Sequence, residues 1–183
     1  MTNSKKLLRP KVLALLTPVI LAPIAIPSAH AFEVCPVQPC RILDTRMGSG
    51  DAFGGAPHRL SPDETMNIDA TEGFIGGQGG ATNCLVPFPE ANGVFINVIA
   101  VQPTGSFNNH LKVYPYNSSE PGASTINYEP GSFALANGVF VALCTLASPS
   151  GSGCGDDLSI TNGPSASTDV VIDVTGYTAS SCL

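Results

Sequence analysis

Tryptophan is absent from the 183-residue chain, and only 8 lysines and arginines stand against 14 aspartates and glutamates. Half of the basic residues lie within the first 31 positions, so residues 32–183 keep four of them against all fourteen acids, a formal net charge of −10. Such a segment has no basic stripe for phosphates, which argues against nucleic-acid binding. Anionic membrane surfaces would repel it for the same reason.

The sequence also lacks the motifs of several catalytic and metal sites. No C-x-x-C pair occurs, and His58 and His110 stand alone, which argues against a zinc site. G-x-S-x-G does not occur, so a nucleophile elbow is excluded. Asp156-Asp157 or Asp51 would be the candidates for calcium, but such a site needs about six oxygens, usually from several segments, and two adjacent acids are more often a solvated turn. We therefore expect no metal and no cofactor.

The first 31 residues have the layout of a secretory signal peptide. A start that carries Lys5, Lys6, Arg9 and Lys11 precedes an apolar stretch that ends in Ala29-His30-Ala31. This order predicts cleavage after Ala31 and a single domain over 32–183, in a secreted protein that is extracellular or periplasmic. The alternative is an uncleaved membrane anchor, which Pro18, Pro23 and Pro27 disfavour. After cleavage no segment is long enough for stable membrane insertion.

All six cysteines follow the predicted cleavage site, at positions 35, 40, 84, 144, 154 and 182. An even count in an exported chain predicts three disulfides, but six cysteines allow 15 pairings that sequence alone does not resolve. Cys144–Cys154 is the simplest pair to assign, because "CTLASPSGSGC" reads as a loop closed at its ends.

No helical pattern is present after residue 31; short runs rich in valine, isoleucine, tyrosine and threonine alternate with glycine, proline and asparagine turns. These runs, each a predicted strand, are residues 65–70, 93–101, 110–116, 124–129, 137–144, 157–161 and 168–177. Residues 47–64 and the glycine-rich 73–83 are predicted surface loops, and no helix follows them to hold a phosphate. The pattern predicts an all-β fold, an antiparallel β-sandwich or jelly-roll-like domain stapled by disulfides.

Five stretches in order resemble a β-rich module of secreted bacterial proteins, notably actinobacterial ones. "CRILDTR" (40–46) resembles its "RLLDTR", "FINVIAVQPTG" (95–105) its "LNVTVVxPTGxG", and "LKVYPYNSSEPGASTINYEPG" (111–131) its "LTVYPxGxxxPxxSxLNFxxG". "LANGVFV" (135–141) resembles "VANxVxV", and "DVVIDVTGY" (169–177) resembles "xVIVDVxGY". The resemblance implies a Cys40–Cys84 bridge, which leaves Cys35–Cys182 to join the two ends. It carries no established reaction or catalytic residue.

The charged residues of "CRILDTR" admit two interpretations. Asp44 and Arg46 are two apart, so on a strand they would share a face, and Asp173 in the closing "IDV" is a natural partner for Arg41 or Arg46. We interpret the four as structural ion pairs that join the first strand to the last. The alternative is that Asp44 and Asp173 are the carboxylates of a glycosidase.

Asparagines and tyrosines supply the remaining candidates. Asn97, Asn127 and Asn137 sit among apolar neighbours and are predicted to form a buried polar ladder, with sugar binding as the alternative. Asn137-Gly138 is alternatively a turn. Tyr114, Tyr116 and Tyr128, together with Tyr177 and Phe107, are candidates for an aromatic sugar-binding surface, although ordinary sheet packing is the commoner role of such residues.

We therefore expect a secreted, non-catalytic β-domain for cell-surface binding, adhesion or assembly, with carbohydrate recognition as one form of it. Its partner would be a cell-surface glycan or another surface protein, and open sheet edges favour a homo-oligomer. The alternative is a small extracellular glycoside or cell-wall hydrolase that uses Asp44 or Asp173.

Overall fold

The structure is a computed structural model that describes residues 32–47, 57–71, 75–144 and 154–182. The described residues contain eight strands and no helix. The strands are β1 (Glu33–Asp44), β2 (Thr65–Ile68), β3 (Gly93–Gly105), β4 (Asn109–Pro115), β5 (Ile126–Tyr128), β6 (Ala134–Ala142), β7 (Leu158–Asn162) and β8 (Ala166–Ala179).

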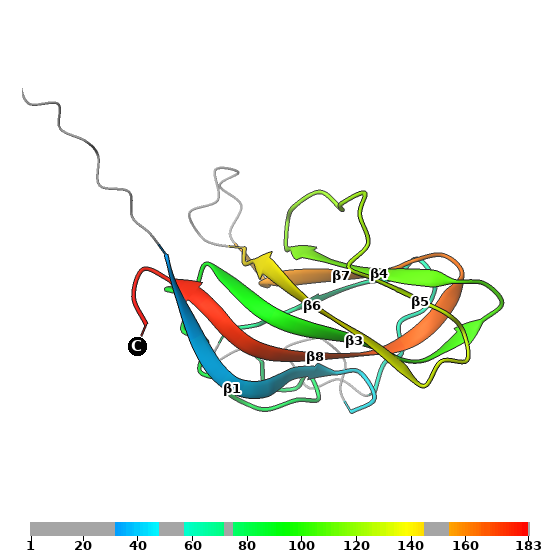
Figure 1. Cartoon of the computed structure of the whole chain (residues 1–183), viewed down its shortest axis with the longest axis horizontal. Coiled ribbons are helices and arrows are strands. Elements are labelled where there is room, and N and C mark those ends of the chain that lie inside the picture. The colour runs from blue at the N-terminus through cyan, green and yellow to red at the C-terminus, as the bar shows by residue number, and fades with distance from the viewer. Residues whose placement is uncertain (1–31, 48–56, 72–74, 145–153, 183) are drawn as a thin grey trace, which may run out of the picture.

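The strands form two antiparallel sheets that pack face to face. One sheet has the order β1-β8-β3-β6 and the other β2-β7-β4-β5. Figure 1 shows the long strands β1, β8 and β3 side by side, with β4 and β7 in the second layer. The predicted all-β sandwich is confirmed, because all seven predicted strand segments overlap β2 to β8.

The core lies between the sheets, where alternate side chains of each strand meet. On β3, Val94, Ile96 and Val98 are buried, whereas Phe95 and Asn97 face outward and are half-buried. Although the run 93–101 is almost continuously apolar, only its core-facing side is fully buried. By contrast, every residue of the central strand β7 is buried. Its outward-facing Ser159 and Thr161 bond to Asn67 of β2 and to the Tyr114 hydroxyl of β4, respectively.

Three disulfides link the sandwich, and no cysteine is free. Cys144 pairs with Cys154, the bridge assigned from its loop, while Cys40 pairs with Cys84 and Cys35 with Cys182, the two pairs that the resemblance implied. Three disulfides suit an oxidising, extracellular environment. The predicted signal peptide (1–31) lies outside the described residues, and no described segment forms a helix that would span a membrane.

We predict that the two bridges with the most different loop lengths contribute unequally to stability. Cys35–Cys182 closes a separation of 147 residues and Cys144–Cys154 one of 10. In the chain-entropy model, replacing both cysteines of the first pair by alanine should lower the free energy of unfolding by about 2 kcal/mol more than the same change in the second pair. Denaturant unfolding of the two double variants measures the difference; equal losses would contradict the prediction.

Candidate functional site

The stretch "CRILDTR" ends β1 and turns away from the sheet. β1 stops at Asp44, and residues 45–47 form a turn in which the Met47 amide donates to the Asp44 carbonyl at 2.9 Å. Arg46 therefore lies in a turn. The spacing had suggested that it shares a strand face with Asp44, and this expectation is wrong. The two side chains still meet, because the turn folds Arg46 back over the strand end.

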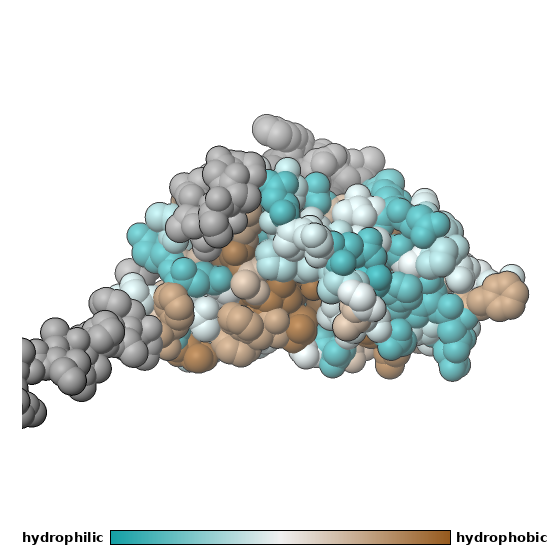
Figure 2. Space-filling view, turned by 90° about the horizontal axis from the view of Figure 1, so that it is seen from above, coloured by the Kyte–Doolittle hydropathy of each residue, from teal (hydrophilic) through white to brown (hydrophobic). Residues whose placement is uncertain are grey.

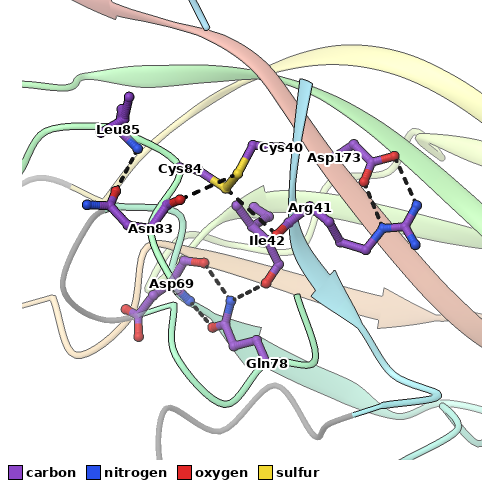
Figure 3. Close-up of a disulfide and its surroundings, with 9 residues drawn as sticks. All are labelled: Cys40, Arg41, Ile42, Asp69, Gln78, Asn83, Cys84, Leu85 and Asp173. Carbon is purple, nitrogen blue, oxygen red and sulfur yellow. Dashed lines mark hydrogen bonds and ion pairs between the residues drawn. A yellow bond between two sulfur atoms is a disulfide. The ribbon is translucent and has the colours of Figure 1, made fainter. Parts of the chain in front are cut away.

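Arg41 lies between the two carboxylates that a glycosidase would use. It stands opposite Asp173 in the β1–β8 register, and its Nε donates to Asp173 Oδ1 at 2.9 Å. Its Nη1 also donates to Asp44 Oδ2 at 3.3 Å. Figure 3 shows the Arg41 guanidinium directed at Asp173 across the two strands. Both acids are thus held by an arginine, an arrangement that suits a lock between strands and leaves neither as a free nucleophile.

Arg46 holds Asp44 in a two-pronged contact. Its Nε donates to Asp44 Oδ1 at 2.8 Å and its Nη2 to Oδ2 at 2.7 Å, while the carboxylate side chain is only 4% exposed. The hydrogen bonds from Arg46 hold the pKa of Asp44 below its ordinary value of 3.8. A glycosidase general acid needs a raised pKa, so the environment of Asp44 opposes the hydrolase alternative.

A third arginine joins the same end of the sandwich. Arg59 forms an ion pair with Asp169 at the start of β8 and donates to the Ser167 carbonyl at 3.3 Å. The Thr45 hydroxyl donates to Asp169 Oδ1 at 3.4 Å and accepts from the Val170 amide at 2.9 Å. Sequence reasoning missed this pair, because Arg59 lies in a predicted surface loop with no strand periodicity around it.

Gln78 connects the two sheets, because it bonds to β1 and to the segment just after β2. Its side chain is completely buried, and Nε2 donates at 2.9 Å both to the Ile42 carbonyl of β1 and to the Asp69 carbonyl just after β2. Oε1 accepts from the Asp69 amide at 2.7 Å. Figure 3 shows Gln78 bridging these two segments below the Cys40–Cys84 disulfide. A Cβ on the nearby Gly80 would lie 2.3 Å from the Arg41 carbonyl oxygen, which explains why this glycine-rich loop can pack against β1.

Asp157, which was expected in a solvated turn, is instead an inward-facing residue that serves the fold. Asp157 is buried, and its Oδ2 accepts from the Ala70 amide at 2.8 Å and from the amide and hydroxyl of Thr71, each at 2.9 Å. Within the described ranges no three metal-ligating side chains come together, and Asp51 lies outside those ranges. Asp157 is therefore an anchor for the chain that leaves β2.

The predicted buried ladder of asparagines is wrong. Asn127 and Asn137 are exposed, because they lie on β5 and β6, which have a neighbouring strand on one side only among the described residues. Asn97, on the inner strand β3, is half-buried. Asn137 instead donates to the Thr125 carbonyl at 2.7 Å, and Asn127 accepts from the Ser124 hydroxyl at 2.9 Å. Asn137-Gly138 is not a turn either, since both residues lie within β6.

A different polar cluster is buried beside the segment that carries Arg59. Asn109 Nδ2 lies 3.0 Å from the Tyr128 hydroxyl and 3.2 Å from Asn162 Oδ1, and it also donates to the Gly163 and Ala166 carbonyls. Asn162 in turn donates to the carbonyls of Ser61 and Ala166. No sequence pattern indicated this cluster, because both asparagines adjoin turns and resemble ordinary turn residues.

The tyrosines do not form an exposed platform for sugars. Tyr114, Tyr128 and Tyr177 are buried and Tyr116 is half-buried, so they pack within the sandwich, the commoner of the two roles considered for them. Tyr128 contributes only to a hollow of about 320 Å³ between β5 and β6, which it lines together with Asn108, Asn127, Glu129, Ser132 and Leu135. Phe107 is exposed at the β3–β4 turn and does not line this hollow, although its neighbour Asn108 does.

An apolar groove of about 710 Å³ opens beside the Cys40–Cys84 bridge. The first half of β1 forms one wall and the segment 83–87 another, and the apolar lining includes Pro36, Val37, Pro39, Leu85, Pro87 and Tyr177. The cysteines of two disulfides, Cys35–Cys182 and Cys40–Cys84, also line it and fix its walls. Neither the groove nor Leu85 was predicted, because proline-rich segments have no periodicity that reveals a concave surface.

Leu85 is the most unusual residue of this groove. Its side chain is 69% exposed, and its backbone has a φ of 57°, in the left-handed region that branched, bulky residues rarely adopt. Asn83 Oδ1 accepts from the Leu85 amide at 2.7 Å, which fixes the turn (Figure 3). An exposed leucine in a strained conformation favours a role in binding, since neither property stabilises the fold.

We predict that Arg46→Ala lowers the free energy of unfolding by roughly 1–2 kcal/mol at pH 7, because a buried carboxylate loses charge-assisted hydrogen bonds. This decrease in the free energy of unfolding should have its full size above pH 3.8. It should become smaller as the pH falls through the lowered pKa of Asp44, since a protonated Asp44 no longer attracts the guanidinium. Glu120→Gln is the control: it breaks the Lys112–Glu120 pair at a carboxylate that is 45% exposed. It should lower the free energy of unfolding less than Arg46→Ala does. A pH-independent loss on thermal melting would contradict the ion-pair interpretation.

We predict the opposite pH dependence for Asp69. Burial, and then the negative charges of Asp157 and Asp156, raise the pKa of Asp69 from 3.8 to about 7. The folded chain therefore binds more protons than the unfolded chain between these values, so stability falls as the pH rises through this window. Asp69→Asn should raise the free energy of unfolding at pH 8 by on the order of 1–4 kcal/mol and change it little at pH 3.5.

Denaturant unfolding at both pH values measures this effect, with Asp63→Asn at an exposed turn as the matched control. A gain of equal size at both pH values would show that the asparagine stabilises the fold for another reason.

Comparison of the chain with protein-family models, with curated proteins and with solved structures found no match. The site is therefore interpreted from its own geometry.

Proposed function

We propose that this chain is a secreted, non-catalytic binding module that attaches to another protein of the cell surface through the groove beside Cys40–Cys84. The observation that carries the proposal is Leu85, an exposed leucine in a left-handed conformation on the groove wall. Strained backbone and exposed apolar area both cost stability, and they persist where binding uses them. The nearby Phe88 is 43% exposed and adds apolar area next to Pro87.

The lining of the groove favours a polypeptide over a glycan as its occupant. Proline, valine and leucine side chains dominate the lining, and its one aromatic residue, Tyr177, is only 4% exposed. Sugar rings bind best on open aromatic faces flanked by amides and carboxylates, whereas an apolar peptide segment matches aliphatic walls. The two flanking disulfides keep the groove preformed, which lowers the entropy lost on binding.

Carbohydrate recognition is a second candidate, supported by the hollow between β5 and β6. Asn108, Asn127, Glu129 and Ser132 supply amide, carboxylate and hydroxyl groups to it. The hydrolase alternative has less support, because Arg41 and Arg46 hold both of its carboxylates.

We predict that Leu85→Asn abolishes binding to apolar peptides without destabilising the domain. Asparagine adopts the left-handed conformation readily, so the free energy of unfolding should stay the same or rise by about 0.5–1 kcal/mol. A screen of the disulfide-bonded domain against arrayed peptides, a glycan array and purified peptidoglycan, with a turnover assay on the same ligands, measures binding and catalysis together.

Phe107→Asn removes an equally exposed apolar side chain outside the groove and is the matched control. Peptide binding that Leu85→Asn leaves intact would refute the groove as the site. Glycan binding that Asn127→Ala abolishes would support the second candidate, and turnover would support the hydrolase.

A further inference from the structure

We infer that two copies of this chain pair through the free edge of β6 and join their first sheets into one continuous eight-stranded sheet. The inference goes beyond the proposed function and concerns a different surface. β6 and the groove lie at opposite edges of the first sheet, because the strand order is β1-β8-β3-β6.

The four sheet edges of the described chain are protected very differently. At one edge, β1 carries Pro36 and Pro39, two disulfides and two interruptions of its register with β8. The edges of the second sheet, β2 and β5, are only 4 and 3 residues long. β6 has nine residues in uninterrupted register with β3, with no proline and no charged side chain. Prolines, bulges, charges and short length are the devices that keep edges from pairing, and β6 has none of them.

The backbone groups that face the free edge can be assigned from the register. Gln102 donates to the Phe133 carbonyl just before β6, and Leu143 donates to the Asn92 carbonyl just after it, each at 2.9 Å. Bonded positions alternate in an antiparallel ladder, so the odd-numbered residues of β6 bond to β3. The edge-facing N–H and C=O groups therefore belong to Ala134, Ala136, Gly138, Phe140 and Ala142. Within the described ranges these groups have no other backbone partner.

The side chains of these five residues are self-complementary in one register. Val139 and Val141 pack toward the core, so the even-numbered residues face outward. In antiparallel pairing about Gly138, glycine meets glycine, Ala136 meets the second copy's Phe140, and Ala134 meets its Ala142. Every large side chain thus faces a small one, as expected for a twofold interface. Phe140 is 47% exposed in the single chain and would gain cover there.

The distribution of charged residues favours contact between two copies along β6 over contact through other surfaces. Residues 130–155 contain no charged side chain, whereas residues 32–183 carry a formal net charge of −10. Two copies would repel each other over most of their surface, and least along β6. Figure 2 shows hydrophobic residues gathered in the middle of one face, with hydrophilic residues covering much of the rest.

Sedimentation analysis of the disulfide-bonded domain over a range of concentrations tests the inference. The chain should form a dimer, and Ala136→Lys should convert it to a monomer. The melting temperature of this monomer should match that of the parent at concentrations low enough to dissociate the parent dimer. Ala123→Lys adds the same charge to an exposed alanine between β4 and β5 and should remain dimeric. A parent chain that stays monomeric throughout, or an Ala136→Lys variant that still dimerises, would overturn the inference.

Covalent trapping tests the register independently. A Cβ at Gly138 meets nothing within 4 Å, so Gly138→Cys fits the fold. Bonded antiparallel partners lie about 5.5 Å apart between Cα atoms, within reach of a disulfide or a short thiol crosslinker. Gly138→Cys should form covalent dimers many times faster than Gly122→Cys, another glycine with open space around it. Equal rates would exclude pairing about Gly138.

The two proposals fail separately in these experiments. An Ala136→Lys monomer that still binds apolar peptides would leave the groove assignment standing. A dimer that binds no peptide would leave edge pairing standing and refute the groove.

Discussion

The pairing of the first strand with the last is the constraint on which the rest of the structure depends. β8 lies between β1 and β3, so the first sheet is complete only when the chain's final strand enters it. Arg41 holds Asp173 across this pair, Arg59 holds Asp169 at one end of it, and Cys35–Cys182 closes the other end. Charge and covalent bonding therefore act at the same place, between strands that are far apart in sequence.

The arginine contacts are better understood as register devices than as sources of large stability. A partly buried ion pair loses much of its attraction to desolvation, so replacing it with apolar residues is often neutral. Its geometry is demanding, however, and a one-residue slip of β1 against β8 would separate Arg41 from Asp173 and reverse every side chain. This cost of misalignment accounts for charged groups at the edge of an apolar core.

The sequence was sufficient for the fold class, because alternating strands and turn residues recur over most of residues 65–177 and leave few other architectures. It also indicated that Asp173 pairs with an arginine near the first strand, but it left open whether that arginine is Arg41 or Arg46. It failed for Asn127 and Asn137 and left two roles open for the tyrosines, because periodicity shows that a side chain alternates but not which face another sheet covers. Tyr114 and Tyr128 are covered, whereas the edge-strand asparagines are not. The roles of Gln78 and Leu85 could not be predicted from the sequence, since they depend on the conformation of loops.

The bond between Cys35 and Cys182 also determines how the module responds to mechanical load. A pulling force applied to the segments before Cys35 and after Cys182 passes through the disulfide and bypasses the 147-residue separation that it closes. The strands, the groove and the free edge of β6 then experience almost no tension, because the disulfide prevents the chain between the two cysteines from being stretched. A chain held at both ends would keep the groove and the free edge of β6 folded under a force that unfolds a sandwich without this bridge.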